Sequence, residues 1–271
     1  ARALLEADAE TLPSFWDEVA GIGWLGLHLT EEHGGSGFGM EELVVVVEEM
    51  GRVVAPGPFV PTVIASAFIA AAGDDAAKAA YLPRLADGSL TAAVATDAAV
   101  TVAGGKATGS AGVVVGAPLA GIILVPAGED VVIVEAGRGV ALETPTNLDQ
   151  ARRASKVTLT DAPATVIVGG RRALTDYTRL LFSAEAVGMA RECTEQAAEY
   201  AKVRQQFGRP IAMFQAVKHH CADMLVAAEM ATSGVWDAAR AAKTGGDQLS
   251  YAAAMAATLA ARSEEHTSEL Q

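Results

Sequence analysis

Hydrophobic positions in the first third of the chain repeat with the period of an α-helix. Apolar residues recur at this spacing over residues 1–20, which predicts an amphipathic helix. Residues 40–50 contain four consecutive valines, a pattern typical of strands, but the flanking glutamate pairs and the glycine that follows favour a buried helix. Alanine-rich stretches at 62–72 and 74–86 predict two further helices. We therefore expect a helical N-terminal domain over residues 1–89.

From Leu90 onward the pattern changes to short β-branched runs separated by glycines. Such runs, with turn signals between them, predict a small antiparallel barrel or sandwich. A turn at residues 161–164 is expected to end this region, so that the β domain covers residues 90–165. The predicted strands lie within residues 92–96, 100–102, 113–115, 122–125, 131–134 and 157–159.

Helical periodicity returns in the last third. Residues 171–203 predict one long amphipathic helix, in which small residues allow a neighbouring helix to approach closely. Further helices are expected over residues 210–243 and 247–262, so residues 166–261 form a C-terminal helical domain. The fold class is therefore mainly α with a small β domain. The buried face of the long helix is expected to carry Leu174, Leu181, Ala184, Val187, Gly188 and Cys193.

Residues 262–271 break abruptly from the alanine-rich composition before them. Their sequence, Arg-Ser-Glu-Glu-His-Thr-Ser-Glu-Leu-Gln, is similar to one translated frame of a common short-read sequencing adapter. We interpret this tail as adapter-derived and exclude it from inferences about fold and function, as for any sequence scar. The natural gene is then expected to continue past Ala261.

Composition narrows the classes of function. The chain has 271 residues, of which 51% are hydrophobic, enough for one large domain or two to three small ones. A formal net charge of -13 argues against a general nucleic-acid binder and against an anionic membrane surface as partner. No apolar run is long enough to span a bilayer without interruption. Cys193 and Cys221 lack metal-ligand spacing, so we expect no metal site, reduced buried thiols and a cytoplasmic location.

The stretch of residues 200–217 carries the most informative polar pattern. It indicates a helix end, a short turn allowed by Gly208, and a new helix whose first turn accommodates Pro210. A guanidinium suits a phosphate and planar rings suit a planar ligand. The alternative is an ordinary helix hairpin with a solvated arginine and two core phenylalanines. The side chains around the turn are Arg204, Gln206, Gln215, Phe207 and Phe214.

The order Arg-x-Gln-Phe-Gly-x-Pro-Ile-x-x-Phe-Gln-Ala-Val at residues 204–217, followed by Ala-Asp-Met at 222–224, resembles the signature of the acyl-CoA dehydrogenase family. In that family the segment reaches across a subunit interface to the FAD of the neighbouring protomer, so the resemblance implies a homo- or hetero-oligomer. The residues that it places near the FAD are Arg204, Gln206 and Phe207, at the pyrophosphate and adenine side, and Phe214 and Gln215 close by.

The resemblance also implies the family's architecture and reaction. The architecture is an N-terminal helical domain, a middle β domain and a C-terminal four-helix bundle, which this chain is expected to leave incomplete. The reaction is the α,β-dehydrogenation of an acyl-CoA thioester, with an electron-transfer flavoprotein or similar acceptor as partner. Asp176 and Arg179 match the family's Asp-x-x-Arg, near which the thioester end and pantetheine bind. A salt bridge between the two, worth about 0.2–0.5 kcal/mol, is the alternative.

The middle region departs from the family pattern. Where the family has Thr-Glu-Pro followed by Gly-Ser-Asp, this chain has Thr-Asp-Ala-Ala-Val at residues 96–100, and residues 105–112 lack the tryptophan of a second flavin-binding segment. Thr96 is expected to keep a flavin contact. This chain keeps the segment that reaches the FAD of a neighbouring subunit but lacks much of the two segments that cover the flavin ring. In this it resembles the degenerate partner subunit of actinobacterial heteromeric steroid or lipid acyl-CoA dehydrogenases.

The resemblance assigns no catalytic base to this chain. In most family members the glutamate base lies in a C-terminal segment beyond the end of this chain, and in others directly before the arginine of Asp-x-x-Arg, where this chain has Thr178. Glu185 is expected to have a structural role. One hypothesis is an FAD-dependent acyl-CoA dehydrogenase subunit that is inactive alone because it is truncated. The other is a non-catalytic partner that completes the FAD site of a catalytic homologue.

Overall fold

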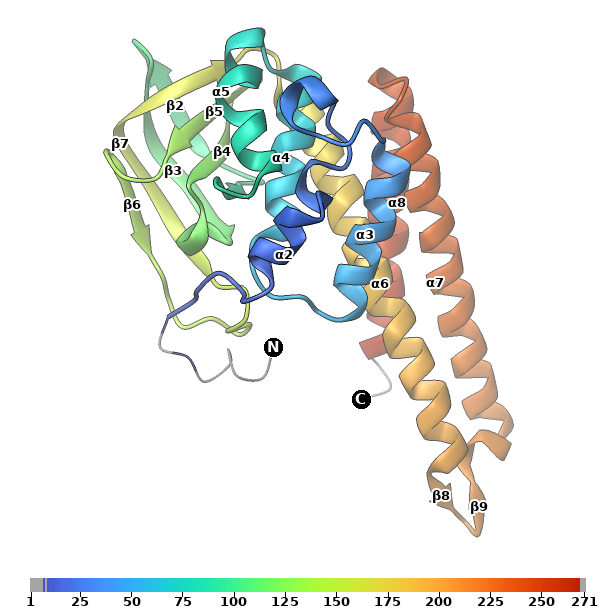
Figure 1. Ribbon diagram of the computed structural model, residues 1–271. Helices are drawn as coiled ribbons and strands as arrows, with labels where there is room; N and C mark the ends of the chain where they lie inside the picture. The colour runs from blue at the N-terminus through green and yellow to red at the C-terminus, as the bar shows by residue number, and fades with distance from the viewer. Residues whose placement is uncertain (1–6, 8, 269–271) are drawn as a thin grey trace. The chain divides into compact units, whose positions relative to one another are not determined.

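The computed structural model describes residue 7 and residues 9–268, with side chains described through Arg262. The chain divides into two compact units, which are described separately. Unit 1 contains the residues up to Leu43 and Pro56–Thr178, and unit 2 contains Val44–Ala55 and the residues from Arg179 onward. Two helices labelled in Figure 1, α3 (Met40–Arg52) and α6 (Arg171–Val203), run from one unit into the other.

The first described helix, α2 (Trp16–Gly21), is shorter than the helix predicted over residues 1–20. Residues 1–6 and 8 lie outside the described part, and residues 9–13 are not helical. The reason is Pro13, which lacks an amide hydrogen and is disfavoured inside a helix. Its carbonyl instead accepts the Trp16 amide at 2.9 Å, just before α2 begins.

Helices α4 (Phe59–Ala72) and α5 (Asp75–Ala86) confirm the two alanine-rich predictions. Short 3-10 turns, Trp24–Gly26 and Glu31–His33, precede α3. Asp74 caps α5 by accepting the Ala77 amide at 2.8 Å. The largest fully buried side chains of this helical part are Leu25, Leu29, Leu43, Ile64, Phe68, Ile69, Leu82 and Leu85.

The β domain of unit 1 is a seven-stranded sheet within the described residues. Neighbouring strands follow the order β1-β4-β5-β7-β3-β2, and β6 also pairs with β7. All pairs are antiparallel except β1 with β4, which is parallel, so the sheet is mixed where an antiparallel one was predicted. The strands are β1 (Ala92–Val94), β2 (Ala99–Ala103), β3 (Lys106–Val115), β4 (Ile122–Ala127), β5 (Asp130–Glu135), β6 (Val140–Glu143) and β7 (Ala154–Ile167).

Strand β7 corrects the prediction of a turn at residues 161–164. The strand continues to Ile167, and Asp161 has a left-handed φ of 49° within it. A single left-handed residue bends a strand without ending it. Strand β7 pairs with β6 before this bend and with β3 on both sides of it, as far as Pro163, and from Ala164 to Ile167 it pairs with β5.

Unit 2 contains most of α6, a short hairpin of β8 (Gln205–Gln206) and β9 (Arg209–Pro210), and the helices α7 (Gln215–Ala241) and α8 (Gly246–Ser268). The predicted bounds of the long helix, residues 171–203, are those of α6. Helix α7 starts five residues later than predicted, because a 3-10 turn at Ile211–Met213 comes first. The residues interpreted as an adapter-derived tail continue α8 as far as Ser268, and residues 269–271 lie outside the described part.

In unit 2, α3 and α6 approach each other through two glycines. A Cβ atom on Gly51 would lie 2.1 Å from the Glu185 carbonyl oxygen, and one on Gly188 would lie 1.9 Å from the Glu48 carbonyl oxygen. Each glycine therefore faces the backbone three residues before the other glycine. This contact confirms that small residues of α6 allow close approach, and it gives Glu185 a backbone packing role.

Charged side chains join the same two helices. Arg191 forms an ion pair with Glu48, whose side chain is largely buried. Arg52 contacts the carboxylates of Glu192 and Glu195, each at 2.9 Å. In unit 2, α3 and α6 therefore pack closely at Gly51 and Gly188, and the ion pairs of Arg191 and Arg52 lie beside this contact.

The cysteine prediction was wrong in part. Cys193 is exposed on α6 and Cys221 is only half-buried on α7, and neither is in a disulfide within the described residues. The other predicted residues of the α6 face are buried, because they follow one stripe from Leu174 to Gly188 that Cys193 does not continue.

Within the described residues, no helix combines the length and apolar character needed to cross a membrane. In the same part of the chain, no group of His, Cys, Asp and Glu side chains is arranged to hold a metal ion.

Candidate functional site

The hairpin between α6 and α7 is a tight two-residue turn. Gln205 pairs with Pro210 and Gln206 with Arg209, which leaves Phe207 and Gly208 at the tip. Their φ angles, 54° and 75°, are both left-handed, as in the type I′ turns that suit two-residue hairpins. Gly208 adopts this conformation freely, as the sequence predicted, whereas for a phenylalanine it is an uncommon backbone state.

The aromatic rings of the hairpin do not form a core. Phe207 is 89% exposed and Phe214 is half-buried, so the alternative of two core phenylalanines is wrong. The two rings meet edge to face, with centroids 6.0 Å apart and an interplanar angle of 85°. The guanidinium carbon of Arg209 lies 4.4 Å from the Phe214 ring centroid, a cation–π geometry. We call Arg204, Gln206, Phe207, Arg209 and Phe214 the hairpin cluster.

The hairpin cluster is an island of positive charge in an acidic chain. Residues 200–222 contain no Asp or Glu, although the chain has 33 acidic residues. Arg204, Arg209 and Lys218 are exposed, and in the described part of the chain none of them has a carboxylate partner. Helix α7 starts after Phe214 without a side-chain cap, so the positive end of its dipole adds to this potential. The arrangement suits an anionic ligand with a planar group.

The backbone of the hairpin holds Arg204 at the junction with α6. The Arg204 amide donates to the Tyr200 carbonyl at 2.9 Å, and its carbonyl accepts the Ile211 amide at 2.8 Å. Gln206 is exposed beside it on β8, and Gln215 is exposed at the first position of α7. The structure therefore brings together Arg204, Gln206, Phe207 and Phe214, with Gln215 directly following.

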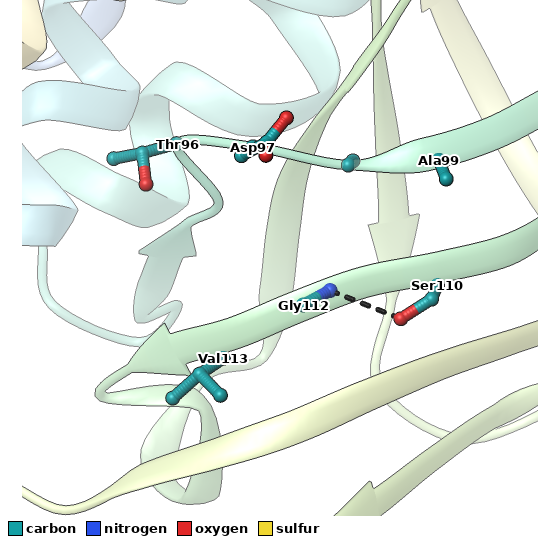
Figure 2. Close-up of a pocket in the computed structure, with 7 residues that line it drawn as sticks. Thr96, Asp97, Ala99, Ser110, Gly112 and Val113 are labelled. Carbon is teal, nitrogen blue, oxygen red and sulfur yellow. Dashed lines mark hydrogen bonds between the residues drawn. The ribbon is translucent and has the colours of Figure 1, made fainter.

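A separate hollow, which we call the β pocket, lies in unit 1 and has a volume of about 390 Å³. Figure 2 shows residues 96–99, which link β1 to β2, facing residues 110–113 of β3. The Ser110 hydroxyl accepts the Gly112 amide at 3.2 Å, as the dashed line in Figure 2 marks. The lining residues are Thr96, Asp97, Ala98, Ala99, Ser110, Gly112 and Val113.

The β pocket offers polar groups but no stacking partner. Thr96 and Ser110 provide hydroxyls and Asp97 a carboxylate, and none of the described lining residues is aromatic. The residues after Gly105, read from sequence as a shortened segment, form strand β3. Its pairing with β7 shifts register on both sides of Gly109 and Ser110, and these irregularities shape the pocket wall.

Asp176 and Arg179 occupy adjacent turns of α6 in different environments. Asp176 is only 4% exposed, whereas Arg179 is exposed. Burial, assisted by the Asp176 charge, raises the pKa of Tyr177. The hydroxyl of Thr178, which occupies the base position of some family members, is buried without a hydrogen-bond partner. A role for Asp176 and Arg179 in substrate binding stays a prediction.

Sequence reasoning missed Arg209, which stands at a variable position of the motif. A usable signal was present, because the whole stretch of residues 200–222 lacks acidic residues in a chain of net charge -13. The cation–π stack itself depends on the turn, which brings Arg209 and Phe214 together, and no spacing rule specifies that contact.

Comparisons with known proteins connect this geometry to a family. The family described as "Acyl-CoA dehydrogenase, N-terminal domain" matches residues 1–89, and "Acyl-CoA dehydrogenase, C-terminal domain" matches residues 171–269. Acyl-CoA dehydrogenase FadE34 of Mycobacterium tuberculosis is 39% identical over 259 residues, which are 94% of this chain. The chain spans only 35% of the length of FadE34.

Further relatives have a length closer to that of this chain. Acyl-CoA dehydrogenase IpdE2 of Mycolicibacterium smegmatis is 30% identical over 87% of this chain and 69% of IpdE2. A solved variant of the Tcur3481-Tcur3483 steroid ACAD superposes with a TM-score of 0.90 and 29% identity, covering 99% of this chain and 79% of that chain. The ChsE4-ChsE5 complex of Mycobacterium tuberculosis also gives 0.90, with 25% identity over 99% of this chain and 78% of that chain. The chain therefore belongs to the acyl-CoA dehydrogenase family.

Proposed function

We propose that this chain is a subunit of an FAD-dependent acyl-CoA dehydrogenase, in which the hairpin cluster contacts the FAD of a neighbouring subunit. The observation that carries the proposal is the exposed Phe207 ring, set between free guanidinium groups on a turn with left-handed backbone. An exposed ring and an uncommon backbone state at one tip are unfavourable in an isolated chain. They are expected where a segment acts on something outside its own chain.

The chemistry of the hairpin cluster fits FAD. Arg204 offers a planar fork of N–H donors that matches phosphate oxygens, and Gln206 adds an amide. Phe207 offers a ring face for a planar group. In the β pocket, Thr96 and Ser110 supply hydroxyls that can hydrogen-bond a flavin edge. Bound FAD would supply the oxidising chemistry by accepting the hydride from the β carbon of an acyl-CoA.

A second candidate is a non-catalytic partner that completes the FAD site of a catalytic homologue. Two observations favour it: the β pocket has no aromatic group among its described lining residues, and Thr178 presents a buried hydroxyl at the position where some family members carry their base. The Tcur3481-Tcur3483 and ChsE4-ChsE5 structures, each named for two proteins, agree with such a pair. Asp176 and Arg179 are proposed to bind the amide-rich arm of the acyl-CoA, and an electron-transfer flavoprotein is the proposed acceptor.

The test is reconstitution with FAD. The full chain is purified alone and co-expressed with a homologous acyl-CoA dehydrogenase subunit from the same genome, and bound FAD is measured by absorbance after gel filtration. Arg204→Gln and Phe207→Ala should each lower bound FAD at least tenfold without lowering the melting temperature, because both side chains are exposed. Lys156→Gln, an exposed cation on β7, is the matched control. If no assembly retains FAD, the proposal fails.

The same assembly separates the two candidates. The partner's glutamate base is replaced by glutamine, and acyl-CoA oxidation is followed with an artificial electron acceptor. With this chain extended past Ala261 by its own genomic sequence, complete loss of turnover supports the non-catalytic role, since only the homologue then holds a base. Residual turnover at about half the original rate assigns a base to this chain as well.

A further inference from the structure

We infer that Arg209 is a second phosphate-binding cation of the hairpin cluster and that the Phe214 ring positions it. The inference rests on the proposed function, because the phosphate in question belongs to the FAD of the neighbouring subunit. It changes the interpretation of Phe214, which the family resemblance places only near the ligand. In this chain the Phe214 ring contacts Arg209 and the Phe207 ring.

The hairpin register places the two arginines diagonal to each other. Gln206 pairs with Arg209, and the Arg204 carbonyl accepts the Ile211 amide one step further along. Paired residues point to the same face, and so do residues two apart on one strand. Gln206 and Arg209 therefore share a face, and the Arg204–Ile211 bond continues the ladder just before β8, which sets Arg204 diagonal to Arg209. Diagonal neighbours of this kind have Cα atoms roughly 7–8 Å apart. At that distance the long side chains of Arg204 and Arg209 can both reach one pyrophosphate.

The contact with Phe214 leaves donors of Arg209 available. A guanidinium has five N–H donors, and its carbon lies 4.4 Å from the Phe214 ring centroid. This cation–π contact restricts the side chain, and no carboxylate of the described residues takes up its donors. The edge contact from Phe207, with centroids 6.0 Å apart, in turn holds the Phe214 ring. The three side chains form a chain of contacts from the hairpin tip to the cation.

Charge supports the same assignment. No carboxylate of the described residues competes for the Arg209 guanidinium, and the nearest acidic residue after it in sequence is Asp223. An arginine kept to stabilise the fold would be expected to meet a carboxylate in a chain with 33 acidic residues. An exposed cation held by a neutral ring keeps its full charge for a ligand.

The experiment measures the FAD dissociation constant of the assembly that retains FAD, by quenching of flavin fluorescence, for wild type, Arg204→Gln and four further variants. Arg209→Gln should weaken binding about tenfold, as expected for loss of a charged hydrogen bond. Arg209→Lys should recover part of this loss, since it keeps the charge but not the planar stack. Phe214→Leu should weaken binding about threefold by releasing Arg209. Lys156→Gln, an exposed cation on β7 outside the hairpin, is the control and should change binding less than twofold.

A second readout separates ligand binding from a purely structural role. Arg209→Gln should also reduce the dependence of FAD affinity on salt between 50 and 300 mM, because one ion contact is lost, while the melting temperature stays unchanged. The inference is overturned if Arg209→Gln binds FAD like wild type while Arg204→Gln does not, a result that leaves the proposed function intact. It is also overturned if Arg209→Gln lowers the melting temperature and leaves salt dependence unchanged. An assembly without FAD refutes both proposals together.

Discussion

The α3–α6 contact in unit 2 allows a sharp test through Gly188→Ala. A Cβ atom at this position would lie 1.9 Å from the Glu48 carbonyl oxygen and 2.8 Å from the Arg52 amide nitrogen, whereas real Cβ contacts under 3.0 Å essentially never occur. The obstructing atoms belong to backbone and cannot rotate away. The two helices must therefore separate, which also pulls Arg191 away from Glu48.

The expected cost follows from two opposing terms. Overpacking of this kind destabilises by about 1–3 kcal/mol, and a rigid backbone neighbour places Gly188→Ala near the upper end. Replacing glycine by alanine inside a helix also stabilises the folded chain by about 1 kcal/mol, because alanine loses less backbone entropy on folding. The net loss is about 2 kcal/mol, which corresponds to a fall in melting temperature of roughly 4–6 °C for a chain of this size.

Thermal unfolding of the full chain, followed by circular dichroism at 222 nm, measures this shift. Gly21→Ala is the matched control, because a Cβ atom there meets nothing within 4 Å, and it should leave the melting temperature unchanged or raise it. In the Gly51→Ala/Gly188→Ala pair the second substitution should cost less than the first, because the helices have already separated. An unchanged or higher melting temperature for Gly188→Ala would refute the close backbone contact.

Three further predictions concern unit 1. Burial lowers the pKa of His28 to about 3, so between pH 6.5 and 3 only the unfolded chain gains this proton and the free energy of unfolding falls. From pH 7 to 5 the loss is about 2 kcal/mol, and urea titrations should show it disappear in His28→Gln; an unchanged pH dependence would contradict the assignment. Thr178→Val should raise or preserve the melting temperature, since it removes an unpaired buried hydroxyl; a fall of several degrees would imply an unseen partner. Asp74→Ala should cost about 1 kcal/mol in urea unfolding by removing the cap of α5, whereas Asp75→Ala should cost less.

Sequence periodicity predicted the helical parts well, because a buried helix face repeats over many residues. The bounds of α6 and the buried stripe from Leu174 to Gly188 followed from that repeat. Periodicity failed where one residue decides the outcome. Pro13 stops a helix in a stretch with helical spacing, and Asp161 bends β7 where turn-forming residues suggested its end.

The candidate site was only partly accessible from sequence. The motif at residues 204–217 and the glycine of the turn could be identified by order and spacing. The exposure of Phe207 and the stack of Arg209 on Phe214 could not, because both result from the hairpin geometry. His28 shows the same limit: no sequence pattern places its Nε2 atom 3.1 Å from the Ser66 hydroxyl or buries its Nδ1 atom.

The position of β7 has a consequence for the order in which the protein is made. It is the last of the seven strands in the chain, yet it lies between β5 and β3 in the sheet. During synthesis, β1, β4 and β5 form one fragment and β2 and β3 another, and each keeps an unpaired edge until Ile167 has left the ribosome. Nascent chains with open strand edges are prone to aggregate. Completion of the sheet therefore waits for its central strand, so the β domain is most vulnerable until β7 has emerged.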